Sequence, residues 1–263
     1  MNVIALTAFD LALAGLLVVV LGAMTVWQSL CVARSLAIAS VRTVLQLLLV
    51  GLVLQWIFDV DHVALVASMS VFMLAVAGYE VMARQNKRFR GLWGYGLGTV
   101  TMFVSSFTVA LLALTTMVGP EPWWTPQYAI PLLGMILGNT MTGIALALDR
   151  LTSAVARERR VIEARLALGH VPHVALATLR REAARAGLMP TINAMATAGI
   201  VSLPGMMTGQ ILAGTPPMIA VSYQILIMFL IAAGTGFGAL AALSLASRRL
   251  FDTRQRLRLD RLA

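Results

Sequence analysis

Seven long apolar stretches dominate this chain and restrict it to one class of fold. A helix needs about 20 mainly apolar residues to cross a lipid bilayer, and each stretch is close to that length or longer. Only 12% of the residues are charged, whereas soluble domains carry roughly 25%. The sequence therefore predicts an all-α polytopic membrane protein with about seven transmembrane helices. The predicted spans are roughly 8–30, 41–58, 63–83, 95–118, 127–148, 190–213 and 217–246.

The basic residues predict how the chain is oriented in the membrane. All 20 Lys and Arg residues lie between the first and second, third and fourth, or fifth and sixth spans, or after the seventh. The connections 59–62, 119–126 and 213–217 contain none. We expect a multi-pass protein of the bacterial inner membrane. Because basic residues remain on the cytoplasmic side, its N-terminus is expected outside and its C-terminus in the cytoplasm. This topology accounts for the net charge of +9, and no nucleic-acid partner is expected.

Cysteine and lysine usage excludes several functions for the chain itself. The single cysteine, Cys31, excludes an intramolecular disulfide framework and a thiolate metal cluster, and we predict a small buried thiol. A P-loop needs the motif G-x-x-x-x-G-K-[ST] to hold phosphates. The only lysine, Lys87, lies in the sequence RQNKRFRG. We therefore expect no ATP hydrolysis, no other enzyme activity and no bound cofactor on this chain.

The long polar segment 149–189 is predicted to form a helix, a break and a second helix beneath the membrane. The first helix carries an apolar stripe at helical spacing and ends at Gly169. The stripe consists of Leu151, Val155, Ile162 and Leu166. The second helix covers about 173–186, and Gly187 and Pro190 close it. Such a segment is typical of an amphipathic helix pair in the headgroup layer, or of a docking element for a soluble partner.

Residues 163–169, EARLALG, resemble the EAA-xxx-G loop of ABC-transporter permeases. Together with the segments 181–214 and 223–240, this loop resembles the FetB-like permeases, the membrane subunits of bacterial iron-export ABC systems. The resemblance implies a homodimer that works with two copies of a separate ATPase subunit, and that subunit would hold ATP and Mg. It also implies a set of ATPase-coupling residues. These are Glu163, Ala164, Arg165 and Gly169, with Arg165 in place of the second Ala of the motif.

Polar and helix-breaking residues inside the spans are costly in lipid, so each is a candidate for the translocation pathway. The sixth span is richest in them. Its Pro204-Gly205 pair predicts a kink near the middle of the span, which can serve as a hinge. The candidate residues are Glu80, Asn139, Asn193, Ser202, Pro204, Gly205, Met206, Met207 and Gln210.

These candidates also have structural interpretations. Neighbouring helices can satisfy a packing kink, and Asn139 can hydrogen-bond between helices. Glu80 precedes Arg84 by four residues, which predicts an ion pair near the cytoplasmic end of its span. The methionines can be flexible core filler. Because the spans hold no cluster of Cys, His and carboxylate residues, the sequence assigns no metal site.

Glycines at G-x-x-x-G spacing predict close contacts between helices. We assign these pairs to packing within or between protomers, and not to chemistry. The pairs are Gly94/Gly98, Gly134/Gly138, Gly205/Gly209 and Gly234/Gly238.

The sequence and the resemblance together predict one permease domain over 1–263, with a coupling insert at 149–189 and a basic cytoplasmic tail at 247–263. The expected function is export of iron or a related metal ion, driven by ATP hydrolysis on a partner chain. Three alternatives stay open. They are an ABC permease for a non-metal substrate, an ion-driven secondary transporter with a buried acid and inverted repeats, and a membrane anchor or sensor that transports nothing.

Overall fold

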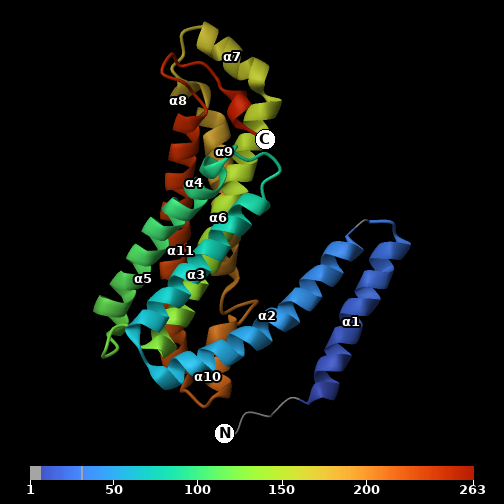
Figure 1. Cartoon of the computed structure of the whole chain (residues 1–263), viewed down its shortest axis with the longest axis vertical. Helices are drawn as coiled ribbons and strands as arrows, with labels where there is room; N and C mark the ends of the chain where they lie inside the picture. Colours follow the sequence, from blue (N-terminus) through green and yellow to red (C-terminus); the bar gives the residue numbers. More distant parts are fainter. Residues whose placement is uncertain (1–6, 31) are drawn as a thin grey trace. The chain divides into compact units, whose positions relative to one another are not determined.

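The computed structural model describes residues 7–30 and 32–263, and these residues form helices and loops without a β-strand (Figure 1). The predicted all-α membrane fold is confirmed. Cys31 lies outside the described residues. The elements up to residue 118 are α1 Ala8–Trp27, α2 Ala33–Val60, α3 Val63–Ala83, α4 Leu92–Met102, the π-helical turn η1 Phe103–Phe107, α5 Thr108–Leu112 and the π-helical turn η2 Ala113–Val118. They are followed by α6 Pro126–Arg157, α7 Arg159–Ala167, α8 Pro172–Ala175, α9 Ala177–Thr197, α10 Gly205–Leu212, α11 Pro217–Arg249 and the 3-10 turn η3 Leu259–Arg261.

The chain divides into two compact units. The first holds the chain up to His62 together with Leu212–Gly214, and the second holds Val63–Ile211 and Thr215–Ala263. Whether both belong to one permease domain stays a prediction. In the described part of α1 and α2 only Ile57 is buried. Both helices therefore expose apolar side chains on every face, as a helix does in lipid or against another protein.

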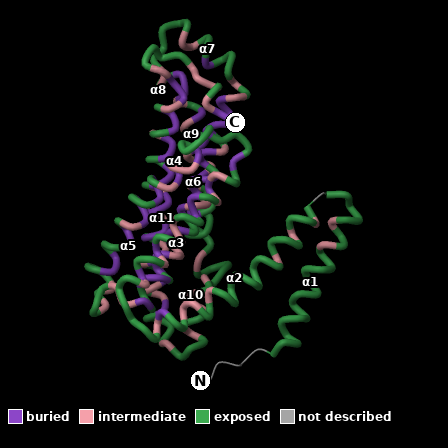
Figure 2. Tube along the Cα trace, viewed as in Figure 1, coloured by how far each residue is buried: buried purple, intermediate pink, exposed green. Residues whose placement is uncertain are grey.

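In the second unit, α6 and α11 pack side by side and form the centre of the helix bundle (Figure 2). Thr140 of α6 fits against Gly234 and Gly238 of α11. A Cβ added at Gly238 would lie 2.8 Å from Thr140 Cγ2, and one added at Gly234 would lie 3.3 Å from Thr140 Oγ1. The small residues therefore let the two helices approach closely, as predicted for the pair Gly234/Gly238.

The other glycine pairs differ in what they contact. Gly98 of α4 packs against Val81 of α3, because an added Cβ would lie 2.7 Å from Val81 Cγ1. A Cβ at Gly134 would lie 3.1 Å from the Met73 methyl carbon. By contrast, Gly205 and Gly209 of α10 face open space in the described chain. The assignment of Gly94/Gly98 to helix packing is confirmed within one chain. In the pair Gly134/Gly138 only Gly134 has such a contact, because a Cβ at Gly138 would meet nothing within 4 Å. The assignment for α10 stays a prediction.

The predicted sixth span differs most from the structure. Among the described residues six helices are long and apolar enough to cross a membrane, and the stretch 190–213 does not supply a seventh single helix. It is divided between the second half of α9 and all of α10. The prediction that Gly187 and Pro190 end a helix is wrong, because α9 continues through both. Gly187 packs against Gly143 and Ala147 of α6, and this close crossing keeps the segment helical.

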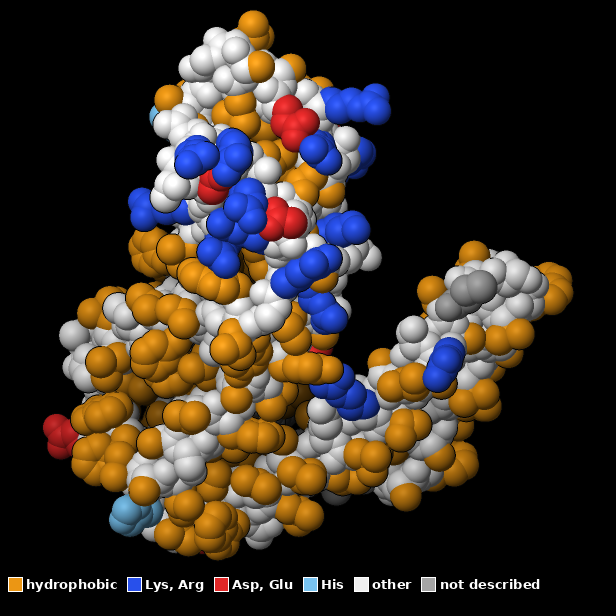
Figure 3. Space-filling model, turned by 45° about the horizontal axis from the view of Figure 1, so that its top comes forward, with side chains coloured by type: hydrophobic (Ala, Val, Ile, Leu, Met, Phe, Trp, Pro, Cys, Tyr) orange, Lys and Arg blue, Asp and Glu red, His pale blue; other side chains and the backbone are white. Residues whose placement is uncertain are grey.

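The ends of several helices are joined at the basic end of the second unit. The Asp149 carboxylate of α6 accepts a 2.7 Å hydrogen bond from the Asn86 backbone N–H. The backbone N–H of Ala263 donates to the Arg88 carbonyl at 2.7 Å. The loop 84–91 is therefore held by α6 on one side and by the C-terminal tail on the other. Figure 1 shows α7, α8 and the C-terminus at this same end, and Figure 3 shows Lys and Arg side chains gathered there.

Candidate coupling surface and translocation segment

The polar segment 149–189, the predicted coupling insert, begins as an extension of α6. This helix has 32 residues, which give a length of about 48 Å, whereas the hydrocarbon core of a bilayer is about 30 Å thick. The helix is therefore longer than one perpendicular crossing of the bilayer needs. At Glu158 the chain bends into α7. Val155 and Ile162 on either side of the bend are buried. Most of the predicted apolar stripe therefore packs within the protein, and α7 does not depend on the headgroup layer to cover it.

Gly169 ends α7 in a defined geometry. Its φ is +88°, in the left-handed region that favours glycine. The N–H of His170 donates to the Arg165 carbonyl at 3.1 Å, and the N–H of Gly169 donates to the Leu166 carbonyl at 3.0 Å. This pair of bonds is the Schellman motif, in which a left-handed residue closes a helix. The sequence prediction that Gly169 ends this helix is therefore confirmed.

The other three predicted coupling residues have different environments. The Glu163 carboxylate accepts a 2.8 Å bond from Arg159 Nε, and both side chains are exposed. Ala164 is exposed as well. Arg165 instead points into the protein, where its guanidinium donates to the Ala175 carbonyl of α8 at 3.2 Å. Glu163, Ala164 and Gly169 are thus accessible to a partner, and Arg165 fastens α7 to α8.

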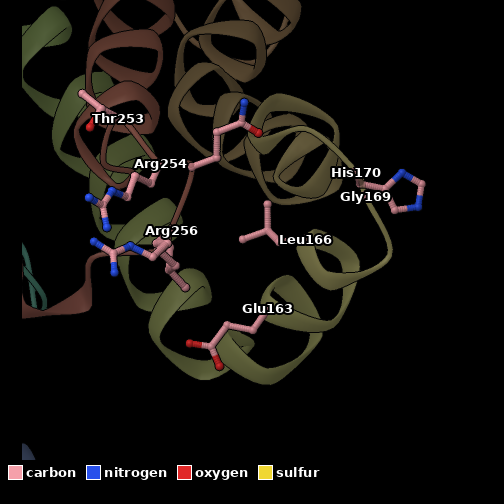
Figure 4. A pocket seen from close by; sticks show the side chains of 9 residues that line it. Glu163, Leu166, Gly169, His170, Thr253, Arg254 and Arg256 are labelled. Atoms are coloured by element: carbon pink, nitrogen blue, oxygen red, sulfur yellow. The ribbon is translucent and has the colours of Figure 1, made fainter.

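The C-terminal tail forms the opposite wall of a cavity beside α7, a feature that the sequence analysis missed. The cavity has a volume of about 690 Å³, and Glu163, Leu166 and Gly169 line it on the α7 side. Arg254 and Arg256 line it on the tail side, while His170 points away from them (Figure 4). The tail was predicted only as basic and cytoplasmic. The apolar residues within it could have indicated a folded segment, because three of them are buried. These are Leu250, Phe251 and Leu262.

The helix that contains the pathway candidates is interrupted rather than kinked. Residues 198–204 separate α9 from α10, and Gly199 has a φ of +80°. The N–H of Gly199 donates to the Ser202 carbonyl at 2.9 Å, and the N–H of Val201 donates to the Thr197 carbonyl at 3.0 Å. The chain therefore makes a tight turn before it continues as a helix.

Pro204 lies directly before α10, where its missing N–H costs nothing. Its carbonyl accepts the N–H of Thr208 at 3.1 Å and so begins the helix. At the other side of the break, the carbonyls of Met195 and Ala196 receive no backbone N–H in the described chain. The break therefore exposes carbonyl oxygens at the C-terminal end of α9.

The side chains around the break face outward from the second unit. Asn193, Ser202 and Gly205 are exposed, and so are the apolar side chains of Ile200 and Val201, at 88% and 80% of their surface. Lipid does not tolerate irregular backbone, which occurs at membrane depth only where protein covers it or where it lines a water-filled cavity. This segment is thus the strongest pathway candidate on geometry.

The methionines and Gln210 lie partly inside the bundle. Met206 lines a cavity of about 60 Å³ together with Met135, and Met207 is half-buried. The Gln210 Oε1 atom is buried and has no hydrogen-bond partner in the described part of the chain. This oxygen is therefore a buried acceptor that the described residues leave unsatisfied.

Asn139 lies on α6 and Glu80 on α3, so neither belongs to the segment around the break between α9 and α10. The exposed Asn139 donates from Nδ2 to the Met135 carbonyl of its own helix at 2.8 Å. Glu80 forms the predicted ion pair, with its carboxylate 3.5 Å from Arg84 Nε. Among the described residues no group of three His, Cys, Asp or Glu side chains could hold a metal ion. The structure thus brings the candidates of 193–210 onto one segment, and it assigns Glu80 a structural partner.

Comparison with known proteins gives several relatives. A UPF0014 membrane protein of Synechocystis sp. is 42% identical over 234 residues, which cover 88% of each chain. The probable iron export permease protein FetB of Escherichia coli is 33% identical over 266 residues, with 98% of this chain and 97% of the relative covered. Protein ALUMINUM SENSITIVE 3 of Arabidopsis thaliana is 34% identical over 201 residues, with 76% and 71% covered. No solved structure matches the chain.

The resemblance to FetB-like permeases is confirmed by these relatives. The match to the model of the uncharacterised protein family UPF0014 extends over residues 8–251. It includes α7, the break between α9 and α10, and every helix long enough to cross a membrane in the described chain. The chain belongs to the UPF0014 family of membrane proteins.

Proposed function

We propose that this chain is the permease subunit of an ABC transporter that exports iron or a related metal ion across the bacterial inner membrane. The observation that carries the proposal is α7, an exposed helix closed by a Schellman motif at Gly169 on the basic end of the second unit. Its sequence has the pattern of an ATPase-coupling loop. The similarity to a relative named as a probable iron export permease supports the choice of substrate.

The coupling contact is proposed to involve the exposed face of α7. Glu163, Ala164 and Gly169 would contact a separate ATPase subunit, which holds ATP and Mg. Arg165 would transmit motion, because its bond to the Ala175 carbonyl links α7 to α8, and α8 leads directly into α9. A displacement of α7 would thus reach the broken helix through a short chain of contacts.

A second copy of this chain is the proposed cover for the segment 198–204. The exposed Ile200 and Val201 side chains would be buried in a homodimer, as the rule for irregular backbone in membranes requires. Asn193, Ser202 and the free carbonyls of α9 would then face a shared pathway. Amide, hydroxyl and carbonyl oxygens are weak ligands for a metal ion compared with thiolate or imidazole clusters. Weak binding suits a site that must also release its ion.

The orientation can be tested with reporters fused at the two ends of the bundle. We expect a reporter at Trp124 to be active outside the cell and a reporter at Arg160 to be active in the cytoplasm, because all basic connections lie on the side of Arg160. Alkaline phosphatase and green fluorescent protein fusions measure the two locations. The reverse pattern would contradict both the orientation and the position of the coupling surface.

The function itself can be tested by reconstituting the chain in vesicles with its ATPase. We expect a complex with two copies of each subunit, and ATP-dependent movement of Fe²⁺ away from the side that holds the ATPase. The control is an ATPase whose P-loop lysine is replaced. Transport that needs only an ion gradient would instead identify a secondary transporter, which also uses broken helices. ATP-driven transport of an organic substrate without metal movement would contradict the metal assignment.

A further inference from the structure

A cavity of about 840 Å³ lies between the C-terminal tail and the ends of α4 and α11. One wall is apolar and contains Trp93 of α4 and Leu245 of α11. Both residues lie in helices long and apolar enough to cross a membrane. The other wall is basic. It contains Arg248, Arg249, Arg254, Arg256, Arg258 and Arg261.

Carboxylates neutralise only part of this basic wall. Asp252 lies 2.8 Å from Arg256, and Asp260 lies 2.8 Å from Arg258. A hydrogen bond from the Arg256 backbone N–H lowers the pKa of Asp252, and the hydrogen bond from the Arg258 side chain lowers the pKa of Asp260 to about 2. Both carboxylates are thus charged at neutral pH. Two carboxylates against six arginines leave four positive charges on this wall.

Arg249 connects the two walls. Its guanidinium carbon lies 4.6 Å from the centre of the Trp93 ring, a cation–π contact. Its Nε atom is buried and has no hydrogen-bond partner within the described chain. Arg248 and Arg254 form no ion pair with any described carboxylate. A buried donor without an acceptor is costly, and this applies to Arg249 Nε. The exposed Arg248 and Arg254 instead carry charges that no described carboxylate pairs with. All three side chains are therefore suited to bind the oxygens of an anion.

We propose that this cavity binds the headgroup of an anionic phospholipid from the cytoplasmic leaflet. Arg248, Arg249 and Arg254 would contact the phosphate, and the acyl chains would lie along Trp93 and Leu245. Basic pockets at the ends of transmembrane helices bind such headgroups, and tryptophan is typical of the layer where headgroup and hydrocarbon meet. A free phosphate ion would use the arginines but leave the apolar wall uncovered. The proposal requires a membrane and does not depend on the transported substrate.

The proposal is tested by native mass spectrometry of the full chain, delipidated in neutral detergent and then mixed with phosphatidylglycerol or with phosphatidylcholine of the same acyl chains. We expect phosphatidylglycerol to bind preferentially. The double variant Arg248→Gln and Arg254→Gln should bind it about 25-fold more weakly, at about fivefold for each arginine lost near a membrane surface. Both side chains are exposed, so the variant should unfold at the same temperature as the parent protein.

A matched control changes two arginines that do not line the cavity. Arg157→Gln with Arg160→Gln removes the same charge from the insert and should leave lipid binding unchanged. Equal binding of the two lipids, or equal losses in the two double variants, would overturn the proposal. So would displacement of phosphatidylglycerol by millimolar inorganic phosphate, because that result would identify a free-anion site. Protection of the same arginines by the ATPase without any lipid preference would identify a protein contact instead.

Discussion

Replacing Gly169 by valine is expected to weaken binding of the proposed ATPase partner by about tenfold or more. Gly169 has a φ of +88°, and an L-residue in the left-handed region costs roughly 1–2 kcal/mol. A β-branched side chain is among the worst for this conformation. The last turn of α7 would therefore unwind, since the bonds from Gly169 and His170 that close it depend on this φ. Glu163 and Ala164 would no longer lie on a fixed surface.

The decisive comparison is between valine and asparagine at this position. Asparagine tolerates the left-handed conformation better than other side chains, and an added Cβ at Gly169 meets no atom within 4 Å. Gly169→Asn should thus retain most of the binding. Gly169→Val should lose about tenfold or more, as expected for a cost of about 1.4 kcal/mol. If the ATPase can bind only when position 169 has no side chain, both variants will lose binding equally.

Co-purification of a tagged ATPase with each variant measures this effect, and circular dichroism of the purified chain checks that the fold is intact. Leu168→Ala is a further control, because Leu168 is exposed next to Gly169 and its replacement leaves the backbone geometry unchanged. Normal ATPase recovery with Gly169→Val would contradict the assignment of α7 as the coupling surface.

The end of α7 could be predicted from the sequence because its determinants are local. Gly169 has a left-handed φ, which glycine adopts more easily than any other residue. Ile162 is buried, as its place in the apolar stripe predicts. The six spanning helices could be predicted for the same reason, since length and hydropathy are properties of short stretches. Arg165 is different, because its bond to the Ala175 carbonyl depends on a turn whose path the sequence does not specify.

Features that depend on distant residues were not predictable in the same way. The C-terminal tail folds because Ala263 and Arg90 bond to segments far away in the sequence, and no local pattern contains those partners. Gly187 and Pro190 are local helix breakers, yet α9 continues because Gly187 packs closely on α6. At Pro204 the sequence indicated a disturbance of the helix correctly. The extent of the disturbance depends on Gly199, five residues earlier, which the kink prediction did not use.

Converting the break into a continuous helix is expected to stop transport while the protein still assembles. Gly199→Ala together with Pro204→Ala is the variant that tests this. In a helix, the Pro204 ring would clash with the carbonyl of Ile200, at a cost of about 3 kcal/mol. Alanine removes this cost, and alanine in place of Gly199 favours the helix by about 1 kcal/mol more. The double substitution thus shifts the balance toward a continuous helix by about 4 kcal/mol.

A continuous helix would return the carbonyls of Met195 and Ala196 to intrahelical hydrogen bonds, so that they could no longer contact an ion. We expect ATP-dependent Fe²⁺ transport in vesicles to fall by at least an order of magnitude, with unchanged recovery of the ATPase. Gly209→Ala is the matched control, because that glycine lies within α10 with open space around it and its replacement leaves the break intact. Full transport by the double variant would show that the break only shapes the helix packing, and the pathway would then have to be sought among other residues.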